Sequence, residues 1–151
     1  MYSTTVTRTV PADRSTVYAA LLDPVAVARW RVPDGMTGEV HELQPHVGGR
    51  IRMSLTYDDP ATAGKSGGAT DTYTGRYAEL VPDERVVEEF EFETGDPALR
   101  GMMTMTTTLT DVAGGTEVVV LHEGIPDAVP ADQNEEGTRM ALAHLARLVE
   151  G

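Results

Sequence analysis

The sequence predicts an α+β fold in which a curved antiparallel sheet of about seven strands wraps around one long C-terminal helix. Residues 133–151 carry the only long helical pattern, and a series of strand-like runs precedes them. Two short helical patterns lie between the first and second of these runs. Because an apolar stripe on an isolated helix is unstable in water, we expect the long helix to cover the sheet.

The N-terminal region begins with a strand over residues 2–10, where Thr and Ser alternate with Val and Arg. Asp13 is a good N-cap for a short helix that reaches Leu22. The Asp-Pro dipeptide at 23–24 is typical of a second helix start. We expect this second helix to end near Trp30, so that two short helices separate the first two strands.

The middle of the chain predicts six more strands, over residues 38–43, 50–57, 72–80, 85–93, 102–110 and 116–123. In the run 50–57, Ile51, Met53 and Leu55 share one face. Residues 58–70 are rich in Gly, Ala, Asp and Pro and have no hydrophobic period. This composition indicates a long hairpin loop that is either mobile or functional.

The last helix is expected over residues 133–150, and its two faces differ in polarity. At about 100° per residue, the inward face holds Asn134, Thr138, Ala141, Leu145 and Leu148, with Leu142 and Val149 beside them. The outward face holds Glu135, Arg139, Ala146, Arg147 and Glu150. A long helix on a strongly curved sheet commonly encloses a space that side chains do not fill, and we therefore expect a cavity beneath it.

Composition limits the function. The length suits one domain, residues 1–151, and the formal net charge of −12 repels nucleic acids and anionic membranes. The chain has no cysteine and no apolar run that could span a membrane, and its first residues do not have the pattern of an export signal. We therefore expect a cytoplasmic protein without a nucleic-acid or membrane partner. Eleven Arg against one Lys is typical of a GC-rich bacterial genome.

Several local motifs carry a family resemblance. They are the Asp-Pro pair at 23–24 followed by Trp30, the Gly-Gly pair at 48–49, the hairpin at 75–87, and the final hairpin with Gly114-Gly115-Thr116 and His122-Glu123-Gly124. In this order they resemble the helix-grip fold of the START-like (SRPBCC) superfamily. The bacterial single-domain branch named after the activator of heat-shock-protein-90 ATPase is the most similar, and the resemblance spans essentially the whole chain.

Two positions depart from this pattern. The branch often has Trp where this chain has Tyr18, and again in the first turns of the last helix, where this chain has Thr138. Because Thr138 lies on the inward helix face, a small hydroxyl there predicts a roomier cavity than the resemblance implies.

Candidate ligand-binding residues are those whose side chains adapt to an apolar guest or face the expected cavity. Methionine is flexible and aromatic rings offer flat contact surfaces. The set comprises Trp30, Met36, Met53, Tyr73, Tyr77, Phe90, Met103, Met105, His122, Thr138 and Leu145. His122 belongs to it because it shares a strand face with Val118 and Val120; it is either a functional imidazole or a core-edge residue bonded to the backbone.

Other polar motifs are ambiguous or weak. Glu88 shares a strand face with Val86 and Phe90, so it either points inward and pairs with Arg52 or Arg76, or it is exposed after a register shift. We expect the exposed position. The pair His41 and His46 is interrupted by Pro45 and does not predict a metal site. The Gly-Lys-Ser sequence at 64–66 lacks the first glycine of a phosphate-binding loop.

The resulting functional hypothesis is a binder of a small hydrophobic or amphipathic molecule, held between sheet and C-terminal helix. Access would be controlled by residues 58–70 and 30–36. We expect a monomer or homodimer with no catalytic residue, no metal and no cofactor. Two alternatives stay open: a cyclase- or aromatase-like enzyme acting on an aromatic or polyketide-type substrate in the same cavity, and a chaperone-interaction module, both implied by the resemblance alone.

Overall fold

The computed structural model describes residues 1–150, which form one antiparallel sheet, three α-helices and a short 3-10 helix. The elements, in chain order, are β1 (Tyr2–Val10), α1 (Arg14–Leu22), α2 (Pro24–Trp30), β2 (Met36–Leu43), β3 (Arg50–Tyr57), β4 (Thr70–Val81), β5 (Arg85–Phe92), η1 (Pro97–Leu99), β6 (Met103–Val112), β7 (Gly115–Ile125) and α3 (Ala131–Val149). The predicted α+β class and the order of its elements are confirmed.

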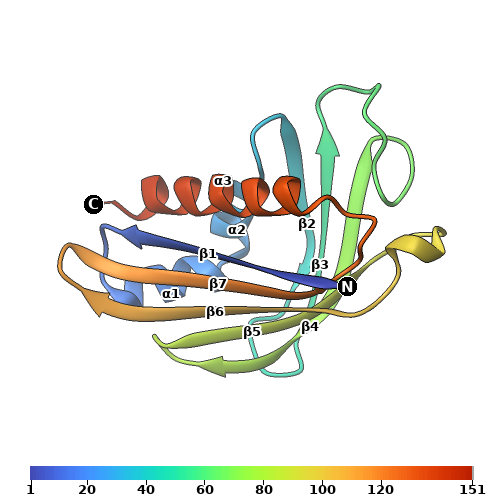
Figure 1. Ribbon diagram of the computed structural model, residues 1–151. Coiled ribbons are helices and arrows are strands. Elements are labelled where there is room, and N and C mark those ends of the chain that lie inside the picture. Colours follow the sequence, from blue (N-terminus) through green and yellow to red (C-terminus); the bar gives the residue numbers. More distant parts are fainter. Residues whose placement is uncertain (151) are drawn as a thin grey trace.

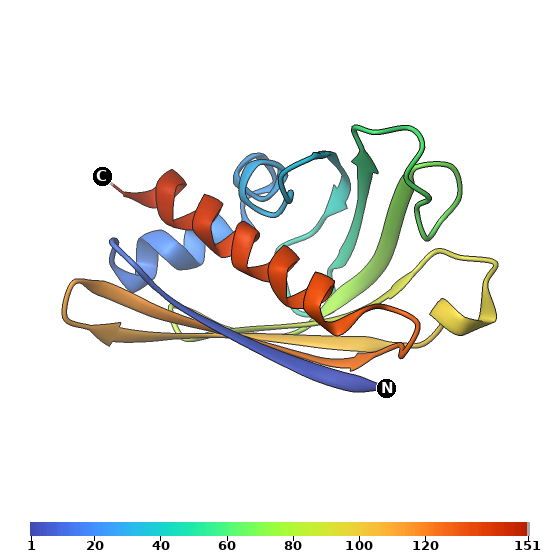
Figure 2. The same ribbon diagram turned by 45° about the horizontal axis from the view of Figure 1, so that its top comes forward.

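The seven strands are arranged in the order β1-β7-β6-β5-β4-β3-β2, and every neighbouring pair is antiparallel. Strands β1 and β2 are therefore the two edges, although they are consecutive along the chain. Helices α1 and α2 carry the chain from one edge to the other. Figures 1 and 2 show α3 lying across the concave side of the sheet, with β2, β3 and β4 rising beside it.

The two short helices begin where the sequence predicts. The Asp13 side chain accepts a hydrogen bond from the Thr16 backbone N–H at 2.8 Å, and the Asp23 side chain accepts one from Val25 at 3.0 Å. The Trp30 indole N–H donates to the Ala20 carbonyl at 2.9 Å. This hydrogen bond joins the end of α2 to α1 and so positions the residues that follow α2.

Strands β4 and β5 approach closely at Gly75. A Cβ atom at this position would lie 2.0 Å from the carbonyl oxygen of Glu89, so only glycine fits the observed backbone. The Gly-Gly pair at 48–49 has a similar steric reason, because a Cβ on Gly49 would lie 2.0 Å from the Gln44 carbonyl oxygen. Both glycine positions singled out in the sequence thus serve the shape of the sheet.

Helix α3 differs from its predicted orientation near the C-terminus. Ala146, expected to face outward, is only 5% exposed, whereas Leu148, expected to face inward, is 37% exposed. The reason is that α3 contacts α1 and α2 as well as β1. Because α3 has neighbours on more than one side, its buried surface is not the single inward face that the periodicity predicts.

Candidate functional site

A cavity of about 230 Å³ lies between the concave face of the sheet and α3. Its apolar wall consists of Leu21, Trp30, Pro33, Met36, Leu55, Tyr57, Tyr73, Val86, Phe90, Phe92, Met105, Val120, Ala141 and Leu142. Its polar wall consists of Arg31, Lys65, Asp71, Glu88, Thr107, His122, Gln133, Asn134 and Thr138. A second hollow of about 290 Å³, between β1 and α3, has no aromatic residue in its wall. The first cavity is therefore the candidate site.

A buried ion pair crosses the cavity wall. Arg31, the C-cap residue that follows α2, places its Nη1 atom 2.7 Å from Oε1 of Glu88 on β5. The guanidinium also lies over the Tyr73 ring, 5.4 Å from its centroid. Burial alone lowers the pKa of Arg31, but the adjacent carboxylate outweighs it and the pKa is raised, so the guanidinium stays charged.

The expected exposure of Glu88 is wrong, since only 4% of the residue is accessible to solvent. The register pairs Glu88 with Met105 on β6, and the β5 residues Val86, Glu88 and Phe90 all line the cavity. Neither arginine suggested as its partner reaches it: Arg52 bonds Glu93, and Arg76 lies 3.6 Å from Glu89. The inward carboxylate is tolerated because Arg31, at the end of α2, neutralises its charge, although the two residues are 57 positions apart in sequence.

His122 lines the cavity from β7, on the same strand face as the buried residues Val118 and Val120. Its Nδ1 atom lies 3.3 Å from Nδ2 of Asn134 on α3, and its Nε2 atom is buried without a hydrogen-bond partner among residues 1–150. Burial, and to a lesser extent the positive charge of Arg31, lower the pKa of His122 to about 4. The imidazole is therefore neutral at pH 7.

The loop between β3 and β4 forms one side of the cavity. The Lys65 ammonium lies 3.0 Å from Asp71 and 5.3 Å from the centroid of the Phe92 ring. The Lys65 backbone N–H donates to the other oxygen of Asp71 at 2.6 Å, and Ser66 exchanges two hydrogen bonds with the Thr72 backbone. These contacts fold the loop back onto β4, so Lys65 and Asp71 belong to the cavity wall.

The structure separates the eleven candidate ligand-binding residues into two groups. The residues that line the cavity are Trp30, Met36, Tyr73, Phe90, Met105, His122 and Thr138. The residues that pack in the core without lining it are Met53, Tyr77, Met103 and Leu145. Core packing occupies the second group, three residues on the sheet and Leu145 on α3: the Tyr73 hydroxyl, for example, donates to Sδ of Met53 at 3.2 Å.

Sequence reasoning missed the charged part of the wall, namely Arg31, Lys65 and Asp71. Each is polar and lies in or beside a loop or helix end, where no periodicity indicates direction. Asn134 could have been found, because the helical pattern already placed it on the inward face of α3.

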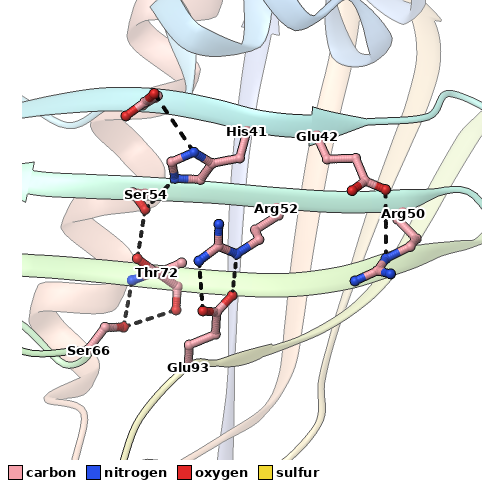
Figure 3. Close-up of polar contacts among 9 residues, drawn as sticks. His41, Glu42, Arg50, Arg52, Ser54, Ser66, Thr72 and Glu93 are labelled. Carbon is pink, nitrogen blue, oxygen red and sulfur yellow. Dashed lines mark hydrogen bonds and ion pairs between the residues drawn. The ribbon is translucent and has the colours of Figure 1, made fainter.

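The outer face of β2, β3 and β4 carries a separate polar network (Figure 3). The His41 Nε2 atom lies 2.7 Å from Ser54 Oγ, which in turn lies 2.7 Å from Thr72 Oγ1. Arg52 makes two hydrogen bonds to Glu93, at 2.6 and 2.9 Å. Within residues 1–150 no group of three His, Asp or Glu side chains could hold a metal ion. In the same range, no helix has the length and apolarity needed to cross a bilayer.

Comparison with known proteins relates this chain to one family and to several solved structures. Residues 11–150 match the family model described as Activator of Hsp90 ATPase homolog 1-like protein. A crystal structure of a protein from Chromobacterium violaceum is 35% identical, with a TM-score of 0.87, over 99% of this chain and 97% of that chain. A crystal structure from Rhodobacter sphaeroides is 25% identical, with a TM-score of 0.80, over 97% and 91%.

A solution structure from Arthrobacter aurescens has a TM-score of 0.79 over 97% of this chain and 85% of that chain. Its identity of 18% shows a shared fold alone. The chain matches no curated protein.

Proposed function

The chain belongs to the activator of Hsp90 ATPase homolog 1-like family, and from this premise we propose that it binds a small hydrophobic or amphipathic molecule in the cavity beneath α3. The cavity itself carries the proposal. It measures about 230 Å³ and its wall is largely aromatic and aliphatic. An apolar guest that leaves water for this wall gains about 25 cal/mol per Å² of buried apolar surface, before ordering costs.

The polar wall supports binding in preference to acid–base catalysis. Glu88 is paired with Arg31 at 2.7 Å, so its carboxylate is already engaged in a buried ion pair. The lowered pKa of His122, about 4, also makes its imidazole a weak base at pH 7. These side chains are suited to orienting a guest.

The test is a titration with 1-naphthylamine, a neutral bicyclic dye whose fluorescence changes when it enters an apolar site. The single tryptophan, Trp30, lines the cavity and is the energy-transfer donor to the bound dye. We expect saturable transfer in the wild type. Substitution of Thr138 by Trp fills the cavity from α3 and is expected to weaken dye binding by about tenfold or more.

The matched control is Arg139→Trp, which adds the same indole one residue away at a side chain that is 54% exposed. This variant is expected to bind the dye as the wild type does. Both variants add a tryptophan, so dye fluorescence under direct excitation is the readout for them. No dye binding by the wild type, or equal binding by Thr138→Trp and the wild type, would refute the proposal.

A further inference from the structure

The charges in the cavity wall cancel in pairs. Arg31 and Glu88 are 2.7 Å apart, and Lys65 and Asp71 are 3.0 Å apart; these four are the charged residues of the wall. A ligand carboxylate would have to compete with Glu88 for Arg31, and a ligand ammonium would have to compete with Arg31 for Glu88. In either case a charge would be left buried without a partner, which is strongly unfavourable. The wall therefore selects an uncharged ligand.

A chain of hydrogen bonds fixes the tautomer of His122. The Thr4 hydroxyl donates to Oδ1 of Asn134 at 2.8 Å, which turns the Asn134 amide N–H toward Nδ1 of His122 at 3.3 Å. Nδ1 is thus an acceptor, and the neutral ring carries its proton on Nε2. That N–H is a buried donor with no acceptor among residues 1–150.

His122 lines the cavity, and an unpartnered buried donor on a lining residue favours a ligand that brings the missing acceptor. We propose that the cavity selects an uncharged, flat apolar molecule with one hydrogen-bond acceptor, such as a ketone or ester carbonyl, which accepts the Nε2–H of His122. This inference rests on the proposed function and names the chemical class of its ligand.

The size and lining of the cavity give the apolar part of the ligand. A dry cavity of about 150 Å³ holds one benzene molecule. The present volume of about 230 Å³ is roughly one and a half times larger, which corresponds to a bicyclic body of about ten non-hydrogen atoms. The rings of Tyr73 and Phe90, with centroids 5.3 Å apart, provide flat surfaces against which it can stack.

The test compares four probes with one bicyclic body: naphthalene, 1-acetylnaphthalene, 1-naphthoate and 1-naphthylmethylammonium. Each is measured by its displacement of 1-naphthylamine. We expect the ketone to bind about three- to tenfold more tightly than naphthalene, as one hydrogen bond provides. The anion and the cation are expected to bind about tenfold or more weakly than naphthalene.

His122→Phe keeps a ring in place and removes the donor. In this variant the advantage of the ketone over naphthalene is expected to vanish, while naphthalene binding is retained and serves as the internal control for folding. A second readout does not depend on a variant that folds: ¹⁵N NMR of the wild-type imidazoles. We expect a protonated Nε2 and an unprotonated Nδ1 for His122, and a shift of the Nε2 proton when the ketone is added.

The outcomes distinguish two failures. If naphthalene displaces the dye but the ketone is no better, or the anion binds best, the binding function stands and this inference is overturned. A proton on Nδ1 of His122 also overturns it. If none of the probes displaces the dye and the dye itself does not bind, the proposed function fails as well.

Discussion

The two faces of the sheet use the same interaction in opposite surroundings. On the concave face, the side chains of Arg31 and Glu88 are 11% and 5% exposed, and on the outer face those of Arg52 and Glu93 are 42% and 37% exposed. The closest contacts are similar, 2.7 and 2.6 Å. Distance alone therefore does not tell the pairs apart, and burial decides how much each one matters.

The largest expected difference follows from breaking the concave pair. Glu88→Leu leaves the Arg31 guanidinium buried without a partner, and we expect the free energy of unfolding to fall by about 3–5 kcal/mol. The double variant Arg31→Met with Glu88→Leu removes both charges and is expected to regain most of the loss. Urea unfolding of the two single variants and the double variant measures the coupling. Additive losses would contradict a pair that acts through its buried charges.

Adjacent residues of β3 give the next comparison, because Met53 points into the core and Ser54 points to the outer network (Figure 3). Met53→Ala opens a cavity beside Tyr73 and is expected to cost about 2–5 kcal/mol. Ser54→Ala removes hydrogen bonds at the surface and is expected to cost about 1 kcal/mol. Thermal and urea unfolding of both variants check the order, and equal losses would mean that the two faces do not differ as described.

A pH titration sharpens the comparison at His122. Above about pH 7.5 the imidazole is neutral in the folded and unfolded chain, so it adds no pH dependence. As the pH falls toward 4, the unfolded chain binds a proton that the folded chain excludes, and stability is lost. We expect a loss of about 2 kcal/mol by pH 5 that is absent in His122→Phe. Parallel pH profiles of the two proteins would contradict the lowered pKa.

The smallest effect is expected on the outer face. Glu93→Gln removes one charge of a pair that water can screen, and we expect a loss below about 1 kcal/mol that shrinks further in high salt. Urea unfolding at low and high ionic strength measures it. A loss as large as that of Glu88→Leu would remove the distinction between the faces.

The helices and strands of this protein could be predicted from the sequence because the patterns that indicate them are local. Asp13 and Asp23 cap the short helices, and alternation in 50–57 separates the two faces of β3. The expectation for Glu88 failed because its partner, Arg31, reaches it through tertiary structure alone. Periodicity states which face a residue occupies and says nothing about distant side chains that compensate a buried charge.

The cavity wall was predicted only in part for the same reason. Tyr73 and Met53 are opposite one another in the register and both point inward, yet only Tyr73 lines the cavity. The end of the Met53 side chain lies beside Gly38 and the Tyr73 hydroxyl, so whether an inward residue meets a void or a neighbour depends on tertiary packing. The 3-10 helix at Pro97–Leu99 was likewise missed, since its one cap, Asp96, lies in a segment without periodicity.

One consequence concerns chemical labelling. Lys65 is the chain's only lysine, so an amine-selective reagent has one side-chain target here, the ε-amine in the wall of the cavity. The ε-amine contacts Asp71 and lies over the Phe92 ring. The rate of its acylation, followed by mass spectrometry of the peptide that contains Lys65, measures how accessible this part of the cavity wall is to solvent.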